Sequence, residues 1–442
     1  MDLILSFIVF MACVLSCVIL NKTVVYALLA GAVLFCGVAL KRKHTPSQLW
    51  KYSVDGIKTS IVVIKLMVLI GCLTALWRAS GTIAFFVYYG VSIITPSMFV
   101  MVSFLLCCMM SYFLGSSFGT ISTAGVMLMI LARSGGADEI ITAGAIMSGA
   151  YFGDRSSPVS SAAFLTATLT DIDPGKNVKM LLKTGSVPIA ICAVIYLILS
   201  FKYPISTVDS LVMDALSSTY NISLWSAVPA IILLILPWLK VSVSNTILVS
   251  TVAAFFVAAF AQDMSFGLLL KQVVMGYTVD SEILGSIMSG GGIISMMEVV
   301  FIVVLSSIYC GIFEGTKMLE SLKGMLSKAS NKVSLYIMQI IISFATVAVF
   351  CNQTIATILS VQLLGDAYEE KGESKMQLAA DIGNSLITIA AIVPWSIACA
   401  VPLAMMDVGS EVVLFSFFLY LNPICYFFTR KIFRLEDSGK GL

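Results

Sequence analysis

The sequence contains little charge. Of its 442 residues 11% are charged and 59% are hydrophobic, and the formal net charge is +2. A soluble domain usually carries about a quarter charged residues, so this chain has too few charges to cover itself with a polar shell. The small net charge also leaves no broad basic surface for nucleic acid. Soluble globular, disordered and nucleic-acid-binding proteins are therefore excluded.

Histidine is nearly absent, because His44 is the only one. A haem-binding membrane subunit needs buried axial ligands, normally histidines, and a zinc protease needs sets such as His-Glu-x-x-His. Both classes are excluded. The 11 cysteines lie mostly in apolar runs and form no Cys-x-x-Cys pair, which indicates packing rather than a disulfide framework. No Walker-type nucleotide motif occurs. We therefore expect no cofactor and no enzyme activity, and transport would be driven by ion gradients.

What the sequence has in abundance is unbroken apolar runs close to the roughly 20 residues that cross a bilayer as a helix. Membrane barrels alternate apolar and polar residues at every second position, so they are excluded. The length allows roughly ten to thirteen membrane segments, and the predicted fold class is an all-α polytopic integral membrane protein. The clearest spans are Leu3–Leu20, Thr23–Leu40, Ile61–Trp77, Thr82–Ile94, Ser97–Leu114, Val187–Phe201, Leu224–Leu239, Thr246–Phe260, Ile293–Phe313, Val333–Phe350 and Val412–Phe428.

Basic residues predict the orientation. The loop from Lys41 to Lys58 carries five Lys and Arg residues against one acid, Asp55, and the positive-inside rule places such a loop in the cytoplasm. The N-terminus, two spans earlier, is then cytoplasmic as well. The first apolar run follows Met1-Asp2 without the basic region of a secretory signal, so we expect a retained membrane helix. The compact loops suit a bacterial inner membrane.

Two regions differ from plain spans, namely residues 115–173 and 351–407. In each, an apolar helix ends in a cluster of small polar residues, and a half-length helix, a charged loop and an apolar segment interrupted at an aspartate follow. Asp154 and Asp381 take corresponding places in this order. Lipid cannot satisfy the backbone of a broken helix, and paired interrupted segments point to the binding site of a secondary transporter. Ordinary loops with small-residue helix packing are the alternative.

The predicted organisation follows from these two regions. It comprises an N-terminal helix (1–22), a first repeat (23–201), a connecting loop (202–223), a second repeat (224–429) and a basic cytoplasmic tail (430–442).

Two aspartates are the leading candidates for ion binding. A charge near the bilayer centre costs several kcal/mol unless it is paired, and hard cations such as Na⁺ take oxygen ligands. Asp154 could instead pair with Arg155 or cap a helix. Asp381, Asn384, Ser385 and Thr388 can share one helical face, which could also be a hydrogen-bonded seam between helices. The expected Na⁺ ligands are Asp154 and Asp381, and the expected ion- or substrate-binding residues around them are Ser157, Ser160, Ser161, Ser116, Thr120, Asn384, Ser385, Thr388, Asn352 and Thr354.

Three further charged residues are candidates. Glu298 lies inside or at the edge of a span, where a buried carboxylate could carry a proton. Arg78 ends another span, where its side chain could extend to the interface or attract an organic anion. Arg155 adds a positive charge beside Asp154 and could also contact an anion.

The sequence resembles the NhaC-type sodium/proton antiporter family of the ion-transporter superfamily, over nearly the whole chain. The segments that carry the resemblance are Trp77 with 80–83 and 88–90, then 115–120, Gly153-Asp154 with 157–160, 290–293, 295–297, 311–316, 366–368 and Pro394-Trp395. The resemblance implies two inverted structural repeats with broken or re-entrant helices, a site near the two broken segments, and Na⁺ and H⁺ as coupling ions. It leaves a homodimer open.

The sequence departs from the family pattern beside Asp154. Family members typically continue the Gly-Asp-x-x-Ser-Pro-x-Ser motif with an aspartate and then threonines, whereas Ser161, Ala162 and Ala163 stand here. These changes weaken a site for a bare cation and suit an anionic or zwitterionic solute. Sodium/proton exchange by alternating access is the leading interpretation. The second is a transporter of small organic acids such as malate and lactate, or of amino acids, which the resemblance also includes.

Two other classes stay open at this stage. Asp154 and Asp381 could act as the dyad of an intramembrane aspartyl protease, since two carboxylates that share a proton can activate water. The contexts of the two residues do not resemble the motifs of that family closely. A passive channel is the other class, and it would conduct without regard to a coupling gradient.

Overall fold

The computed structural model describes residues 2–20, 22–90, 96–203, 210–239, 241–280, 284–285, 288–318 and 333–432. Within these ranges the regular secondary structure is helical, apart from one isolated bridge between Tyr277 and Gly290. Four of the described helical segments are long and apolar enough to cross a membrane, and nine further apolar helices of 10–17 residues accompany them. The prediction of an all-α membrane protein is therefore confirmed. The four long segments are Ser60–Ala79, Pro174–Lys202, Val243–Ala261 and Ile294–Thr316.

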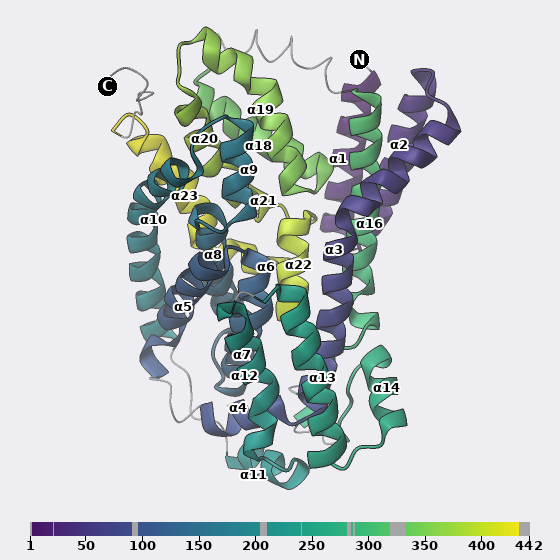
Figure 1. The fold of residues 1–442 in the computed structure, drawn as a ribbon, viewed down its shortest axis with the longest axis vertical. Coiled ribbons are helices and arrows are strands. Elements are labelled where there is room, and N and C mark those ends of the chain that lie inside the picture. Colours follow the sequence, from purple (N-terminus) through teal and green to yellow (C-terminus); the bar gives the residue numbers. More distant parts are fainter. Residues whose placement is uncertain are drawn as a thin grey trace.

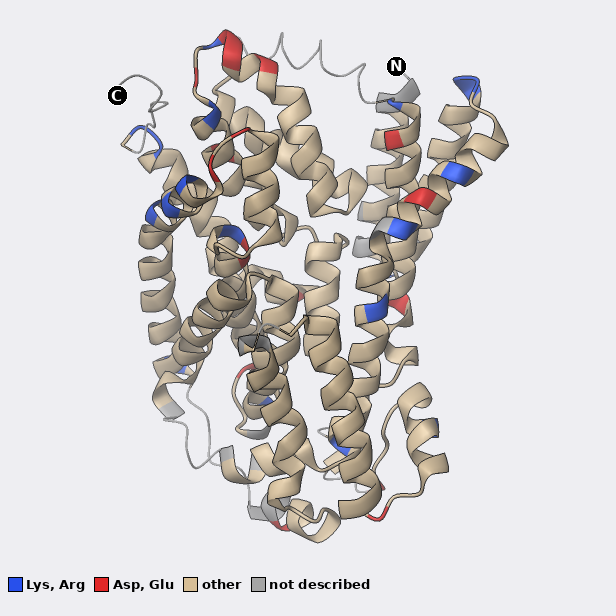
Figure 2. Cartoon of the chain, in the orientation of Figure 1, with Lys and Arg blue, Asp and Glu red and all other residues tan. Residues whose placement is uncertain are grey.

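The helices form an elongated bundle whose two chain ends lie at the same end, with α3 running from there toward the opposite end (Figure 1). Many charged residues gather at the end with the termini, and much of the bundle between its ends is uncharged (Figure 2). The elements of the first part are α1 (Asp2–Ile19), α2 (Val25–Lys41), α3 (Pro46–Ala79), α4 (Thr82–Gly90), η1 (Pro96–Met98), α5 (Phe99–Leu114), α6 (Ser117–Thr120), the π-helical turn η2 (Ile121–Gly125), α7 (Val126–Ser134), α8 (Glu139–Ser156), α9 (Ser161–Leu169) and α10 (Pro174–Lys202).

The second part also differs from the predicted spans at two places. The predicted connecting loop contains helix α11, and the predicted span Val412–Phe428 is broken at Ser416 into η4 and α23. Residues 204–209 of that loop and 433–442 of the predicted tail lie outside the described ranges. The elements are α11 (Ser210–Thr219), α12 (Leu224–Trp238), α13 (Val243–Ala261), α14 (Phe266–Met275), η3 (Ile294–Met296), α16 (Met297–Thr316), α18 (Leu335–Phe350), α19 (Gln353–Glu370), α20 (Lys375–Gly383), α21 (Leu386–Ala390), α22 (Ile397–Met406), η4 (Ser410–Phe415) and α23 (Phe417–Thr429).

Helix α3 begins earlier than the apolar run predicts. Thr45 caps its N-terminus by accepting a hydrogen bond from the backbone of Gln48, the Gln48 side chain accepts one from the Thr45 backbone, and Pro46 occupies the first helical turn. This reciprocal cap satisfies two backbone donors. Most of the predicted loop from Lys41 to Lys58 is therefore helix.

Small residues bring α8 against α5. A Cβ atom on Gly153 would lie 2.2 Å from the carbonyl carbon of Ser111, and one on Gly149 would lie 2.5 Å from the carbonyl oxygen of Phe104. Only glycine permits this backbone approach, which is the usual role of small residues between membrane helices. The contact fixes the end of α8, where Asp154 lies, beside the end of α5.

The two interrupted regions repeat one another at a constant spacing. Helix α18 begins 236 residues after α5 (335 minus 99), and the same difference separates the starts of α19 and α6, α20 and α8, and α22 and α9. Left-handed residues end the first helix of each set, Gly115 with φ 65° and Cys351 with φ 56°. The two regions therefore share a backbone plan.

The capping residues follow the same spacing. Ser116 and Asn352 cap the half-helices after the breaks, Asp138 and Ser374 cap α8 and α20, and Ser160 and Ser396 cap α9 and α22. At this spacing the counterpart of Asp154 is Ala390. The expectation that Asp154 and Asp381 occupy corresponding places is therefore wrong, because the order of events along the chain did not fix their register.

Candidate functional site

The site is built where both broken helices restart. Gly115 and Cys351 turn the chain at the ends of α5 and α18. Ser116 Oγ then accepts a hydrogen bond from Gly119 N at 3.2 Å, and Asn352 Oδ1 accepts one from Thr354 N at 2.9 Å. These side chains satisfy backbone donors that lipid could not. Both caps face one common cavity.

This cavity has a volume of about 520 Å³. Among the described residues, Asp154 is the one charged residue in its wall, and it is 8% exposed. Its Oδ2 accepts a hydrogen bond from Ser117 Oγ at 3.3 Å, and its backbone carbonyl accepts one from Ser160 Oγ. The other polar residues that line the cavity are Ser60, Ser116, Ser117, Ser161, Thr168, Asn352, Gln353, Thr354 and Thr357.

The chemistry of this wall suits a small cation or a proton. One carboxylate with nearby hydroxyl and amide oxygens is a donor set for a hard monovalent cation. The N-terminal ends of the two half-helices carry partial positive charge, which stabilises the ionised carboxylate when no cation is bound. Asp154 can therefore hold either a cation or a proton.

Five of the predicted ligands line this cavity, namely Asp154, Ser116, Ser161, Asn352 and Thr354. The other predicted residues of the first region lie beside it. Thr120 Oγ1 donates to Ser116 O at 2.9 Å, and Ser157 Oγ donates to Tyr112 O at 2.5 Å. Ser160 caps α9 while it holds the Asp154 carbonyl. These hydroxyls bond to backbone carbonyls around the site, and their residues are not among those that line the cavity.

Asp381 lies in a different environment. Its buried carboxylate accepts hydrogen bonds from Tyr368 at 2.6 Å, Gln377 at 2.8 Å and Tyr426 at 2.9 Å, and Arg430 bonds both of its oxygens at 2.9–3.0 Å. It is absent from the wall of the Asp154 cavity. The predicted meeting of the two acids in one cavity is therefore wrong. The protease alternative loses the shared-proton dyad that it requires.

The residues that follow Asp381 do not form one continuous helical face. The helix ends at Gly383 and restarts at Leu386, so the predicted four-residue stripe is interrupted. Asn384 Oδ1 accepts a hydrogen bond from Arg155, Ser385 Oγ donates to Asp381 O at 2.6 Å, and Thr388 Oγ1 donates to Ser385 O at 2.9 Å. These contacts match the alternative of a hydrogen-bonded seam.

Arg155 points away from the cavity that its neighbour lines. It is fully buried, donates from Nη1 to Asn384 Oδ1 at 2.5 Å and from Nη2 to Leu181 O at 2.7 Å, and lies over the Phe418 ring. It makes no ion pair with Asp154 or any other acid in the described ranges. Arg155 therefore ties α8 to the break after α20.

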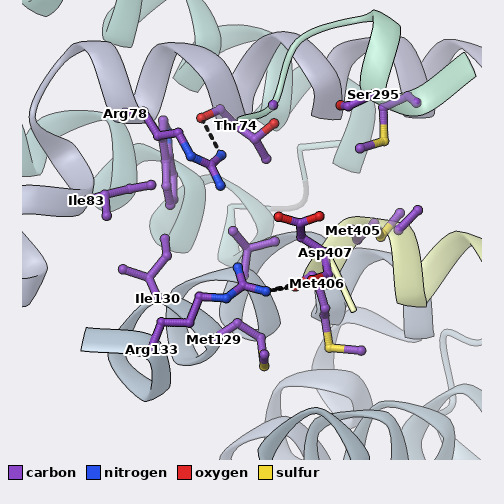
Figure 3. Close-up of a pocket in the computed structure, with 15 residues that line it drawn as sticks. Thr74, Arg78, Ile83, Met129, Ile130, Arg133, Ser295, Met405, Met406 and Asp407 are labelled. Atoms are coloured by element: carbon purple, nitrogen blue, oxygen red, sulfur yellow. Dashed lines mark hydrogen bonds between the residues drawn. The ribbon is translucent and has the colours of Figure 1, made fainter. Parts of the chain in front are cut away.

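Two predictions about single charges need correction. Glu298 is exposed in the first turn of α16, where it accepts a hydrogen bond from Thr23 at 2.5 Å, so it is not a buried carboxylate. Arg78 is only 7% exposed, so it does not extend to the interface. It lines a second, smaller pocket with Arg133 and Asp407 (Figure 3).

Sequence reasoning missed Ser117, Gln353 and Thr357. Ser117 and Gln353 are the first helical residues after the two caps, and the repeat spacing makes them counterparts. The first turn after a helix break faces the break itself, so its polar side chains are natural candidates. Ser117 and Gln353 lie in the small polar clusters that follow the two helix breaks, but the prediction assigned the site to the capping residues next to them.

The apolar helices, together with the sequence relatives of the chain, indicate a multi-pass membrane transporter. The chain belongs to the Na⁺/H⁺ antiporter family, whose sequence pattern matches residues 3–201 and 149–429. It is 25% identical over 88% of its length to the malate-2H⁺/Na⁺-lactate antiporter of Bacillus subtilis (85% of that protein), and 26% identical over 84% to the Na⁺/H⁺ antiporter NhaC of Alkalihalophilus pseudofirmus (82% of that protein). It is 27% identical over 64% to the arginine/ornithine antiporter ArcD of Halobacterium salinarum (61% of that protein).

Proposed function

We propose that this protein exchanges Na⁺ for H⁺ by alternating access, and that the two ions compete for the Asp154 carboxylate. The observation that carries the proposal is that Asp154 is the one charged residue lining a cavity formed by both helix breaks. A single carboxylate that binds either ion couples their movements, because each ion must leave before the other can bind. Family membership and the NhaC relatives support the same exchange.

The repeats support an alternating mechanism. Helix α19 lies toward the end of the bundle with the termini, whereas its counterpart, the stretch α6–η2–α7, extends toward the opposite end (Figure 1). Helix α9 lies toward the end with the termini, whereas its counterpart α22 lies near the middle of the bundle (Figure 1). This difference supports the proposal of inverted repeats, in which a site at the repeat interface is exposed to either side by rocking of one half against the other.

The location follows from charge. Lys and Arg residues gather where α2 joins α3, at the end of the bundle that holds both termini (Figure 2). The positive-inside rule assigns this end to the cytoplasm. We therefore propose a bacterial cell membrane protein with its N-terminus in the cytoplasm.

A second candidate is exchange of small organic solutes. The volume of about 520 Å³ falls within the usual range for small-molecule sites and exceeds what one Na⁺ fills. The name of the Bacillus subtilis relative includes malate and lactate, and that of the Halobacterium relative includes arginine and ornithine. Transport by reconstituted protein, measured against a panel of cations, carboxylates and amino acids, distinguishes the two candidates.

The direct test uses purified protein in proteoliposomes with a preset pH gradient. Addition of Na⁺ should dissipate the gradient, and Asp154→Asn should reduce this exchange to background because the amide carries neither the charge nor the proton. Asp171→Asn is the matched control, since its side chain is 86% exposed outside the cavity. Wild-type exchange in Asp154→Asn would overturn the proposal. Flux of Na⁺ that ignores the pH gradient would identify a passive channel instead.

A further inference from the structure

A second pocket lies toward the other end of the same bundle. It has a volume of about 50 Å³ and is formed by the last turn of α3, by α7, by the loop before η3 and by the end of α22. Arg78, Arg133 and Asp407 are its charged residues, and Figure 3 shows all three directed toward its centre. Nothing in the proposed exchange at Asp154 uses these groups.

Three segments connect this pocket to the Asp154 cavity. Helix α22 lines the cavity with Ile397 and Ala398 and the pocket with residues 404–406. The stretch α6–η2–α7 and helix α3 likewise line the cavity with their earlier residues and the pocket with their later ones. The Asp154 cavity and this pocket are therefore lined by successive parts of the same three segments.

Arg133 is already satisfied and fixes the geometry of the pocket. Its Nε donates to Glu139 at 2.7 Å, and its Nη2 donates to the carbonyls of Met406 and Asp407 at 2.8 Å each. Asp407 ends α22 in the left-handed conformation, with φ 56°. Glu139 balances the charge of Arg133, so Arg78 and Asp407 determine the electrostatics of the pocket interior.

Arg78 and Asp407 make no hydrogen bond to each other, and each has bonding capacity left within the described ranges. Arg78 is more than nine-tenths buried, its Nη1 donates to Thr74 O at 3.1 Å, and its Nε has no hydrogen-bond partner within the described ranges. Asp407 is exposed at the mouth of the pocket, and its carboxylate accepts no hydrogen bond and enters no ion pair with any described residue. A buried guanidinium nitrogen without an acceptor is costly, so a further acceptor supplied from outside the chain would stabilise Arg78.

We propose that this pocket binds a small zwitterionic α-amino acid, with its carboxylate on Arg78 and its ammonium group on Asp407. The guanidinium fork matches a carboxylate in two parallel hydrogen bonds. A simple carboxylate would leave Asp407 as an uncompensated negative charge beside it, whereas a zwitterion satisfies both protein groups. The inference does not depend on Asp154 being the exchange site.

The volume sets the size of the ligand. A water molecule needs about 10–15 Å³ of such space, so about 50 Å³ holds three to five waters. Glycine has five heavy atoms, so the pocket fits the backbone portion of an amino acid. Small side chains, such as that of alanine, are therefore preferred over long ones.

Isothermal titration of the purified protein tests the proposal with four probes: glycine, L-alanine, lactate and ethylamine. Glycine and L-alanine should bind at least about tenfold more tightly than lactate or ethylamine, because a charge-assisted hydrogen bond contributes about 1.5–3 kcal/mol. Arg78→Gln should weaken binding of alanine and lactate by about tenfold or more. Asp407→Asn should reduce alanine affinity to that of lactate.

Controls separate this site from folding defects and from the Asp154 site. Arg42→Gln changes an exposed arginine in the same way and should bind as the wild type does. Arg78→Lys keeps the charge but loses the fork, so it should fold and bind alanine with intermediate affinity. Asp154→Asn should keep full alanine affinity while exchange is lost. Equal binding of lactate and alanine, wild-type affinity in Arg78→Gln, or no binding of any probe would overturn the proposal.

Discussion

The two interrupted regions share one backbone plan and differ in chemistry. Each has a left-handed residue, a capping side chain and a serine that holds a carbonyl six residues earlier, Ser160 on Asp154 and Ser396 on Ala390. Only the first region places a carboxylate at this tethered position. The two regions therefore repeat one backbone arrangement, and only the first carries a charged group at this position.

The acid of the second region, Asp381, differs from Asp154 in its surroundings. Asp381 matches Ala145 of the first region and lies among two tyrosines, a glutamine and Arg430. Its bonds are satisfied within the protein, whereas the Asp154 carboxylate accepts a long hydrogen bond from Ser117 Oγ, at 3.3 Å, and faces a cavity. The partners of a carboxylate, rather than its presence in an apolar chain, therefore distinguish the acid that we propose to bind ions from the acid that is bonded within the protein.

The largest expected effect comes from removing the negative charge of Asp381. Asp381→Asn leaves Arg430 partly uncompensated and should lower the free energy of unfolding by about 3–5 kcal/mol, the usual cost of removing one member of a buried pair. Thermal unfolding in detergent measures it. The double variant Asp381→Asn/Arg430→Gln should recover part of the loss. A stable Asp381→Asn protein that has lost exchange would instead return Asp381 to the binding site.

The next effect compares the two helix breaks. Gly115→Ala should destabilise the protein by about 2 kcal/mol or more, because a left-handed residue with a side chain costs roughly 1–2 kcal/mol and the new Cβ would lie 2.6 Å from the carbonyl carbon of Val159. Cys351→Ala is the matched control, since residue 351 already carries a Cβ at φ 56°. Its unfolding temperature should stay close to that of the wild type. Equal losses in both variants would contradict this prediction, because the left-handed strain and the contact with Val159 are introduced only at Gly115.

The smallest expected effect distinguishes Ser160 from Ser396, the two serines that each bond a backbone carbonyl six residues earlier. Ser160→Ala and Ser396→Ala each remove a helix cap and should each cost about 1 kcal/mol of stability. Only Ser160→Ala should also raise the Na⁺ concentration needed for half-maximal exchange, because only Ser160 holds the residue that carries the carboxylate. Proteoliposome titration with Na⁺ measures this shift. An equal shift in Ser396→Ala would show that the tether acts through the general fold.

Composition and apolar runs were enough to predict the helical membrane class and the two interrupted regions. The capping residues Ser116 and Asn352 were also predicted as part of the site, because small polar clusters in an apolar chain mark broken helices. The start of α3 could have been found from the Thr45, Pro46 and Gln48 pattern, which is a readable cap signature.

The pairing of Asp154 with Asp381 could not be predicted correctly from the order of segments. Register within a repeat depends on where each helix breaks, and the break after Gly383 has no counterpart within α8. The partner of Asp381, Arg430, lies 49 positions along the chain, in a stretch whose basic residues suggested only a cytoplasmic tail. Contacts at such distances depend on tertiary packing rather than on local pattern.

The single carboxylate in the cavity wall has an electrical consequence. One acid can be neutralised by one Na⁺ or by one H⁺, so both loaded forms of the site carry the same charge across the bilayer. Exchange of one ion for the other then moves no net charge, and a membrane potential, which acts on moved charge at about 2.3 kcal/mol per 100 mV, would neither drive nor oppose the cycle. Such an exchanger responds only to the concentrations of its two ions.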